Sequence, residues 1–142
     1  MNVGGKRIYS KAFEGKANIV LWDVFPVTSG EIVLLTFEVK NSEWSQGVWL
    51  MCDEGVEIDG SIGKSAMLWY ETAPKQIRVK CHTKNGLLNV YNIWDRGNGP
   101  NSQSHTSGML VEEIPNGRRY KCNDIGLQTE FDRLVFRVEH LT

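Results

Sequence analysis

The sequence predicts an all-β protein, an antiparallel β-sandwich of jelly-roll type with at most one or two short helical turns. Three observations support this fold class. Apolar residues alternate with polar ones in several runs, as they do in half-buried strands. Turn residues separate the runs at intervals of roughly 8–12 residues, a spacing typical of sandwiches. No apolar stripe of helical period extends beyond about ten residues. A chain of 142 residues is expected to form one domain over residues 1–142.

Three runs show the alternation most clearly, at residues 31–40, 76–82 and 133–139. Because successive side chains of a strand point to opposite faces, every second residue should point into the core. The apolar faces of the three runs carry Val33, Leu35, Phe37 and Val39, then Ile77, Val79 and Cys81, and then Leu134, Phe136 and Val138. Shorter strands are predicted at residues 18–22, 47–52, 87–94, 109–114 and 118–122. Residues 66–70 are either a further strand or one helical turn.

Two Asn-Gly pairs indicate tight turns between predicted strands. Asn85-Gly86 lies between residues 76–82 and 87–94, and Asn116-Gly117 lies between residues 109–114 and 118–122. A type I′ turn needs a positive φ at both central residues, and Asn-Gly supplies it most readily. The sequence therefore predicts a β-hairpin at each pair.

The bulk composition narrows the classes of partner and compartment. The net charge is −1, and the one dense basic cluster is Arg118, Arg119 and Lys121. We therefore expect no nucleic-acid or membrane partner, because nucleic-acid binding needs a wider basic surface. Cys52, Cys81 and Cys122 are odd in number and far apart, and no apolar leader begins the chain. These features predict free thiols and a cytoplasmic location.

The segment that follows Trp94 is the strongest candidate for a binding site. It is long for a loop in a compact domain, and such loops are often functional. Its planar hydrogen-bonding groups suit vicinal hydroxyls, and an aromatic ring could support the apolar side of a sugar. The predicted ligand residues are Tyr91, Asn92, Trp94, Asp95, Arg96, Asn98 and His105. The alternative is a structural loop, because Asp, Asn and Gly occur in most turns and a Trp at a strand end is usually buried.

Residues for catalysis or metal binding are weakly represented. Glu57-Ile58-Asp59 resembles the start of a glucanase strand motif, but Gly60-Ser61-Ile62 follows and the third acid is missing. The spacing of Cys122 and His105 does not place them together as a thiol catalytic pair. No catalytic residue and no cofactor is therefore predicted. A structural calcium at the acidic residues 53–59 is kept as an alternative, although these residues lack the spacing of a calcium loop.

The short alternating strands, the run Gly86-Leu87-Leu88-Asn89-Val90-Tyr91-Asn92 and the closing strand at residues 131–138 resemble galactose-binding-like and related carbohydrate-binding modules. The resemblance is one of architecture over most of the chain. It implies a ligand held at loop ends or on one sheet face, often beside a structural calcium. We therefore expect a non-catalytic module for a small molecule or glycan, most favourably a carbohydrate or polyol. A protein-interaction or homo-oligomerising β-domain is the second reading, and a small enzyme is the third.

Overall fold

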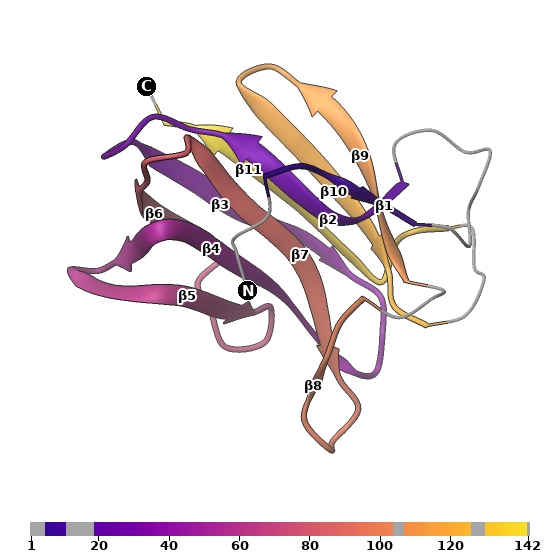
Figure 1. Cartoon of the computed structure of the whole chain (residues 1–142). Coiled ribbons are helices and arrows are strands. Elements are labelled where there is room, and N and C mark those ends of the chain that lie inside the picture. The colour runs from indigo at the N-terminus through magenta and orange to yellow at the C-terminus, as the bar shows by residue number, and fades with distance from the viewer. Residues whose placement is uncertain (1–4, 11–18, 104–106, 126–129, 142) are drawn as a thin grey trace.

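A computed structural model describes residues 5–10, 19–103, 107–125 and 130–141 of the chain. These residues form β-strands joined by turns, and none of them is helical, so the described part contains no helix able to cross a membrane (Figure 1). The strands are β1 (Ile8–Tyr9), β2 (Ile19–Pro26), β3 (Ile32–Lys40), β4 (Ser45–Ile58), β5 (Ser61–Trp69), β6 (Gln76–His82), β7 (Leu87–Asp95), β8 (Pro100–Asn101), β9 (Gly108–Ile114), β10 (Gly117–Asn123) and β11 (Leu134–His140).

The sheet closes on itself, so the predicted jelly-roll sandwich is wrong and the fold is an antiparallel β-barrel of eight strands. Hydrogen bonds run around the ring in the order β2-β9-β10-β11-β3-β6-β4-β7, and the ring closes where residues 23–26 of β2 pair with residues 87–90 of β7. β1, β5 and β8 lie outside the ring, paired with β2, β4 and β7. A sandwich and a barrel bury the same alternate residues, so the sequence pattern cannot tell them apart.

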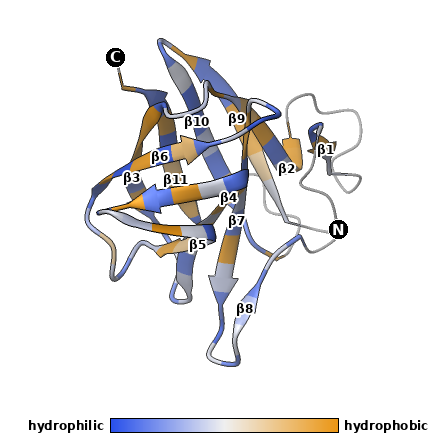
Figure 2. Ribbon diagram, turned by 60° about the vertical axis from the view of Figure 1, so that its left-hand side comes forward, coloured by the Kyte–Doolittle hydropathy of each residue, from blue (hydrophilic) through white to orange (hydrophobic). Residues whose placement is uncertain are grey.

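The barrel interior is filled by the alternate apolar residues of the ring strands. The alternation of hydrophobic and hydrophilic residues is visible along the ribbons (Figure 2). Most of the apolar residues predicted to face inward are buried, including Val33, Leu35, Phe37, Ile77, Val79, Leu134, Phe136 and Val138. Val39 departs from this pattern and is exposed. A small barrel packed in this way has a solid core and no central channel.

The predicted hairpin at Asn85-Gly86 is wrong, because β6 and β7 do not pair with each other among the described strands. Both pair with β4: β6 through residues 55–57 and β7 through residues 45–51 of β4. β5 pairs with both halves of β4, so β6 and β7 follow one another along the opposite edge. The chain makes a corner between them, and Asp53 accepts hydrogen bonds there from the backbone N–H groups of Lys84 and Asn85.

The second predicted hairpin is confirmed, since β9 and β10 pair from Ile114 and Gly117 outward. The turn itself differs from the predicted type I′ turn at Asn116-Gly117: its two central residues are Pro115 and Asn116, only Asn116 has a positive φ (64°), and Gly117 already pairs with Ile114. Proline followed by a residue of positive φ is typical of a type II turn. Gly117 is needed for a separate reason: a Cβ atom there would lie 2.0 Å from the carbonyl oxygen of Val138.

The remaining predicted strands are present, with longer bounds in several cases. Residues 66–70 fall largely in β5, so the strand alternative is correct and the helical turn is not adopted. The sequence did not indicate β1 or β8. β8 pairs with β7 through Asn101 with Trp94 and Pro100 with Asp95, so the expected long loop begins with a hairpin (Figure 1).

Candidate functional site

The predicted ligand residues on β7 point in different directions. Tyr91 is half-buried and stacks on Trp49, with ring centroids 4.5 Å apart. Burial raises the pKa of Tyr91, and a hydrogen bond with Ser102 opposes that effect. Asn92 is on the opposite face and buried, and its Nδ2 donates to the carbonyl oxygen of Asn123 at 3.2 Å. Trp94 is 1% exposed, so its ring is packed inside the barrel.

The predicted ligand residues beyond Trp94 are partly occupied by the turn itself. Oδ1 of Asp95 accepts hydrogen bonds from the backbone N–H groups of Gly97 and Gly99. The guanidinium of Arg96 lies 5.2 Å from the ring centroid of Trp44, and Asn98 is exposed. His105 lies outside the described residues. None of the described predicted residues lines either of the two cavities described next, although Asn92 and Arg96 lie near the second.

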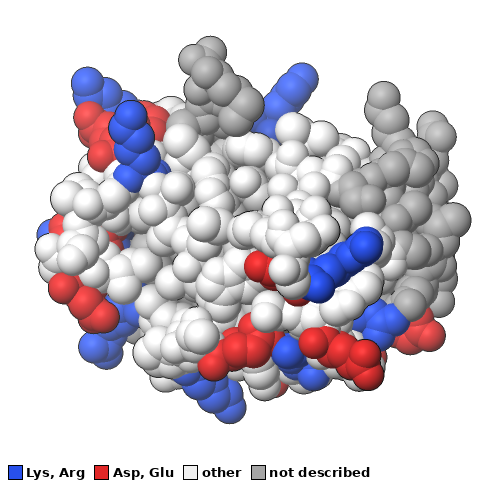
Figure 3. Space-filling view, turned by 90° about the horizontal axis from the view of Figure 1, so that it is seen from below, with Lys and Arg blue, Asp and Glu red and all other residues white. Residues whose placement is uncertain are grey.

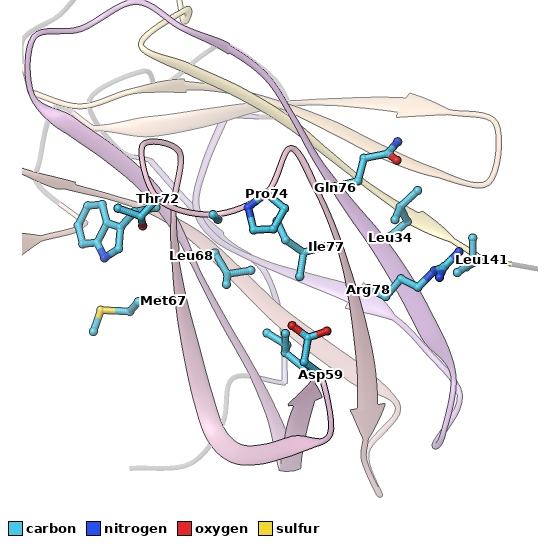
Figure 4. A pocket seen from close by; sticks show the side chains of 13 residues that line it. Leu34, Asp59, Met67, Leu68, Thr72, Pro74, Gln76, Ile77, Arg78 and Leu141 are labelled. Atoms are coloured by element: carbon cyan, nitrogen blue, oxygen red, sulfur yellow. The ribbon is translucent and has the colours of Figure 1, made fainter.

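A cleft of about 610 Å³ lies between β5 and β6, and we call it the β5–β6 cleft. Figure 4 shows Met67 and Leu68 of β5 on one side, with Leu34 and Arg78 on the other. The volume falls within the usual range for ligand pockets, about 300–1,000 Å³. Nine of the residues that line it are apolar and four are polar; the apolar ones are Leu34, Ile58, Met67, Leu68, Trp69, Ala73, Pro74, Ile77 and Leu141, and the polar ones are Asp59, Thr72, Gln76 and Arg78.

One wall of this cleft is a strand edge without a strand partner. β6 pairs with β4 only through residues 80–82, so residues 76–79 have no strand on that side among the described residues. The N–H of Cys81 donates to the carbonyl oxygen of Glu31, and the N–H of Phe37 donates to the carbonyl oxygen of Lys75. The backbone groups of odd-numbered residues along β6 are therefore the ones that bond to β3. Because bonding alternates along an antiparallel strand, the N–H and C=O groups of Gln76 and Arg78 are directed away from β3.

Two charged side chains of opposite sign border the cleft. Asp59 lies in the turn between β4 and β5, where its φ of 52° is positive, and Arg78 is an exposed residue of β6. Neither forms an ion pair or a side-chain hydrogen bond with another described residue. Met67, at 52% exposure, adds accessible apolar surface beside them. The cleft thus combines an apolar floor, unused backbone groups and two available charges.

A second cavity lies at the end of the barrel where the interior becomes polar. Three buried polar residues continue the inward-facing rows of the core: Gln46 of β4, Asn92 of β7, and Asp124 directly after β10. We call these three residues the polar end. Nε2 of Gln46 donates to Oδ2 of Asp124 at 3.1 Å, while Oε1 of Gln46 is buried and accepts no hydrogen bond within the described part of the chain. An unsatisfied buried acceptor costs about 1–3 kcal/mol, which a bound donor would offset.

The basic cluster predicted on the strand after Asn116-Gly117 is neutralised by carboxylates. Arg118 pairs with Asp23 and Glu113, Arg119 with Glu38 and Glu112, and Lys121 with Glu112. On the face shown in Figure 3, acidic and basic side chains are interspersed near the edge and uncharged residues occupy the middle. Neither the basic cluster nor this face forms a patch of purely positive or purely negative charge.

Sequence reasoning missed both cavities. Gln46 lies two residues before Val48 and four before Leu50, which point inward from the predicted strand 47–52. Alternation therefore places Gln46 on the core face, and this signal was visible in the sequence. The cleft had no such signal, because it depends on where β4 ends relative to β6. No described group of three or more His, Cys, Asp or Glu residues is placed to hold a metal ion, so the structural calcium gains no support.

Comparison of the chain with protein-family models, with curated proteins and with solved structures finds no match. The resemblance to galactose-binding-like modules therefore stays a prediction. Functional inference therefore depends on the geometry of the described residues.

Proposed function

We propose that this chain is a non-catalytic protein-interaction module that binds an extended segment of a partner protein in the β5–β6 cleft. The observation that carries the proposal is the free edge of β6 beside an apolar cleft. Strand addition to an exposed edge is a recurrent mode of peptide recognition. Main-chain hydrogen bonds supply affinity in this mode, and side-chain pockets supply specificity.

The geometry supports an extended peptide better than a compact polar ligand. A peptide strand offers the N–H and C=O groups that Gln76 and Arg78 leave without a strand partner, and its alternate side chains would pack against Leu68 and Ile77. The nine apolar lining residues suit the alternate apolar side chains of an extended peptide. Asp59 and Arg78 favour a segment that carries a basic and an acidic side chain on either side of an apolar one.

The proposal is tested with a nonapeptide library displayed on phage and selected on the full chain. We expect enrichment of peptides with alternating apolar residues, and their affinities are measured by fluorescence anisotropy. Gln76→Pro removes one N–H from the free edge and should weaken binding at least about tenfold, the effect of losing roughly 1.4 kcal/mol. The fold should persist, since proline is tolerated at the start of a strand and on an open edge.

Gln76→Ala is the matched control, because it removes the same side chain and keeps the N–H group. It should leave peptide affinity within about threefold of the unmodified chain, a change below 1 kcal/mol. Equal loss in both variants would show that the Gln76 side chain, and not strand pairing, holds the peptide. Failure to enrich any peptide, together with binding of a glycan that Trp69→Ala abolishes, would replace this function with the carbohydrate reading.

A further inference from the structure

The polar end of the barrel is independent of the β5–β6 cleft and has a small pocket of its own. The pocket has a volume of about 240 Å³ and is lined by Ser42, Glu43, Trp44, Asp124, Ile125 and Arg133. Since one water occupies about 30 Å³ of liquid, this volume equals that of roughly eight waters. A ligand of one small ring therefore fits, and a peptide strand does not.

Asp124 supplies a buried carboxylate to this pocket although it is only 3% exposed. Its Oδ1 accepts a hydrogen bond from the backbone N–H of Ile125 at 2.8 Å, and Nε of Arg133 lies 3.9 Å away. Its Oδ2 accepts from Gln46. A carboxylate oxygen has two lone pairs, so each oxygen can still accept from a ligand.

The orientation of Gln46 behind the pocket is set by Asp124. An ionised carboxylate can only accept hydrogen bonds, so the amide nitrogen of Gln46 must face Asp124 and its oxygen must point elsewhere. That oxygen is the buried acceptor without a donor among the described residues. Gln46 does not line the pocket, so the carboxylates that a guest can reach there are those of Glu43 and Asp124, and the guanidinium of Arg133 is a donor beside them.

The charges around the pocket balance. Glu43 and Asp124 are opposed by Arg133 and by Arg96, whose guanidinium lies over the ring of Trp44. A charge-balanced site has little attraction for an ion of either sign, whereas a hydroxyl group can both donate to Asp124 and accept from Arg133. Trp44 adds an aromatic wall of the kind that packs against C–H groups.

From these observations we propose that the pocket at the polar end binds a small neutral polyol, held by Asp124 and Arg133 and packed against Trp44. The site shares no lining residue with the β5–β6 cleft. Either function can therefore fail without the other.

The test titrates the full ¹⁵N-labelled chain with myo-inositol and follows its amide signals by NMR. We expect saturable shifts confined to Trp44, Ile125 and Arg133 and their neighbours, with a dissociation constant of about 1–10 mM. Cyclohexanol, which has the same ring and one hydroxyl, should bind at least tenfold more weakly. Ethanolamine, a small cation, should cause no saturable shift at these residues.

Asp124→Asn and Trp44→Ala should each weaken myo-inositol binding at least tenfold. Trp44 is half-buried and lies outside the core, so its variant stays informative if Asp124→Asn does not fold. Asp95→Asn is the control at the same end of the barrel, and it should change the affinity less than twofold. No saturable shift up to 100 mM myo-inositol, preferential binding of ethanolamine or cyclohexanol, or unchanged affinity in both variants would each overturn the proposal.

Discussion

The hydroxyl of Tyr120 donates a 2.5 Å hydrogen bond to Oδ2 of Asp23 inside the protein, although their strands β10 and β2 are separated in the sheet by β9. Asp23 is fully buried and also pairs with Arg7 and Arg118. Burial, together with the adjacent carboxylate, raises the pKa of Tyr120 well above its usual value. This network joins β10 to the strand that closes the barrel.

Removing the carboxylate of Asp23 should destabilise the barrel strongly. Asp23→Ala leaves Arg7 and Arg118 without their shared buried partner, and loss of one member of a buried ion pair costs about 3–5 kcal/mol. Tyr120→Phe keeps the stacking on Phe136 and loses only one bond to a charged group, at about 1.5–3 kcal/mol. Urea denaturation measures both. If Asp23→Ala lowered the free energy of unfolding less than Tyr120→Phe does, the ion pairs of Asp23 with Arg7 and Arg118 would not contribute as argued.

Gly117→Ala should cost at least about 2 kcal/mol, because overpacking against backbone cannot be relieved by a side-chain rotation. The added Cβ would lie 2.0 Å from the carbonyl oxygen of Val138 and 2.8 Å from the Cα atom of Glu139. Gly63→Ala is the control, since its nearest contact would be at 3.5 Å. Guanidinium denaturation should separate the two variants clearly. Equal stabilities would mean that β10 and β11 can move apart without cost.

The three cysteines should titrate as free thiols only after unfolding. Cys52, Cys81 and Cys122 are unbridged, as the sequence predicted, and all three are buried. Contact with Cys52 and burial raise the pKa of Cys81, and burial raises the pKa of Cys122, so thiolates are scarce in the native protein. A thiol reagent should find three groups in denaturant and react slowly without it. Fast native labelling of any cysteine would contradict the buried positions.

The free energy of unfolding should decrease in acid partly because Glu38 becomes protonated. Burial by itself would raise the pKa of this carboxyl, but hydrogen bonds from Arg119 and Arg137 outweigh it and lower the pKa below the usual 4.5. A lowered folded pKa contributes stability that is present above pH 4.5 and is lost as the pH falls through the folded value. Glu38→Gln should therefore be less stable at pH 7, and its free energy of unfolding should fall less steeply than that of the unmodified protein as the pH drops below 4.5. Parallel pH curves for the two proteins would rule out this contribution.

The positions of the ring strands were predictable because alternation and turn chemistry are local properties. β6 has the bounds of its predicted run, Gln76–His82, and the hairpin between β9 and β10 follows from the local preferences of Pro115 and Asn116. The buried Asn92 was also foreseeable in part, since Asn89 and Asn92 must lie on opposite faces of one strand and each then needs partners. Asn89 finds them in the indole N–H of Trp22 and the carbonyl oxygen of Met51.

The choice of strand partners was decided only by the tertiary structure. β2 closes the barrel on β7 across more than sixty residues of chain, and nothing in the alternation of either strand specifies the other. The same applies to Asn85-Gly86. A hairpin there would pair β6 with β7, but both strands pair with β4, and the chain forms a corner between them. Both cavities follow from these long-range choices. The cleft exists because β4 ends at Ile58 and leaves residues 76–79 of β6 without a neighbouring strand, and the polar end exists because Gln46 and Asp124 meet across the barrel. Local periodicity determines which residues are buried, whereas packing of distant strands determines what they are buried against.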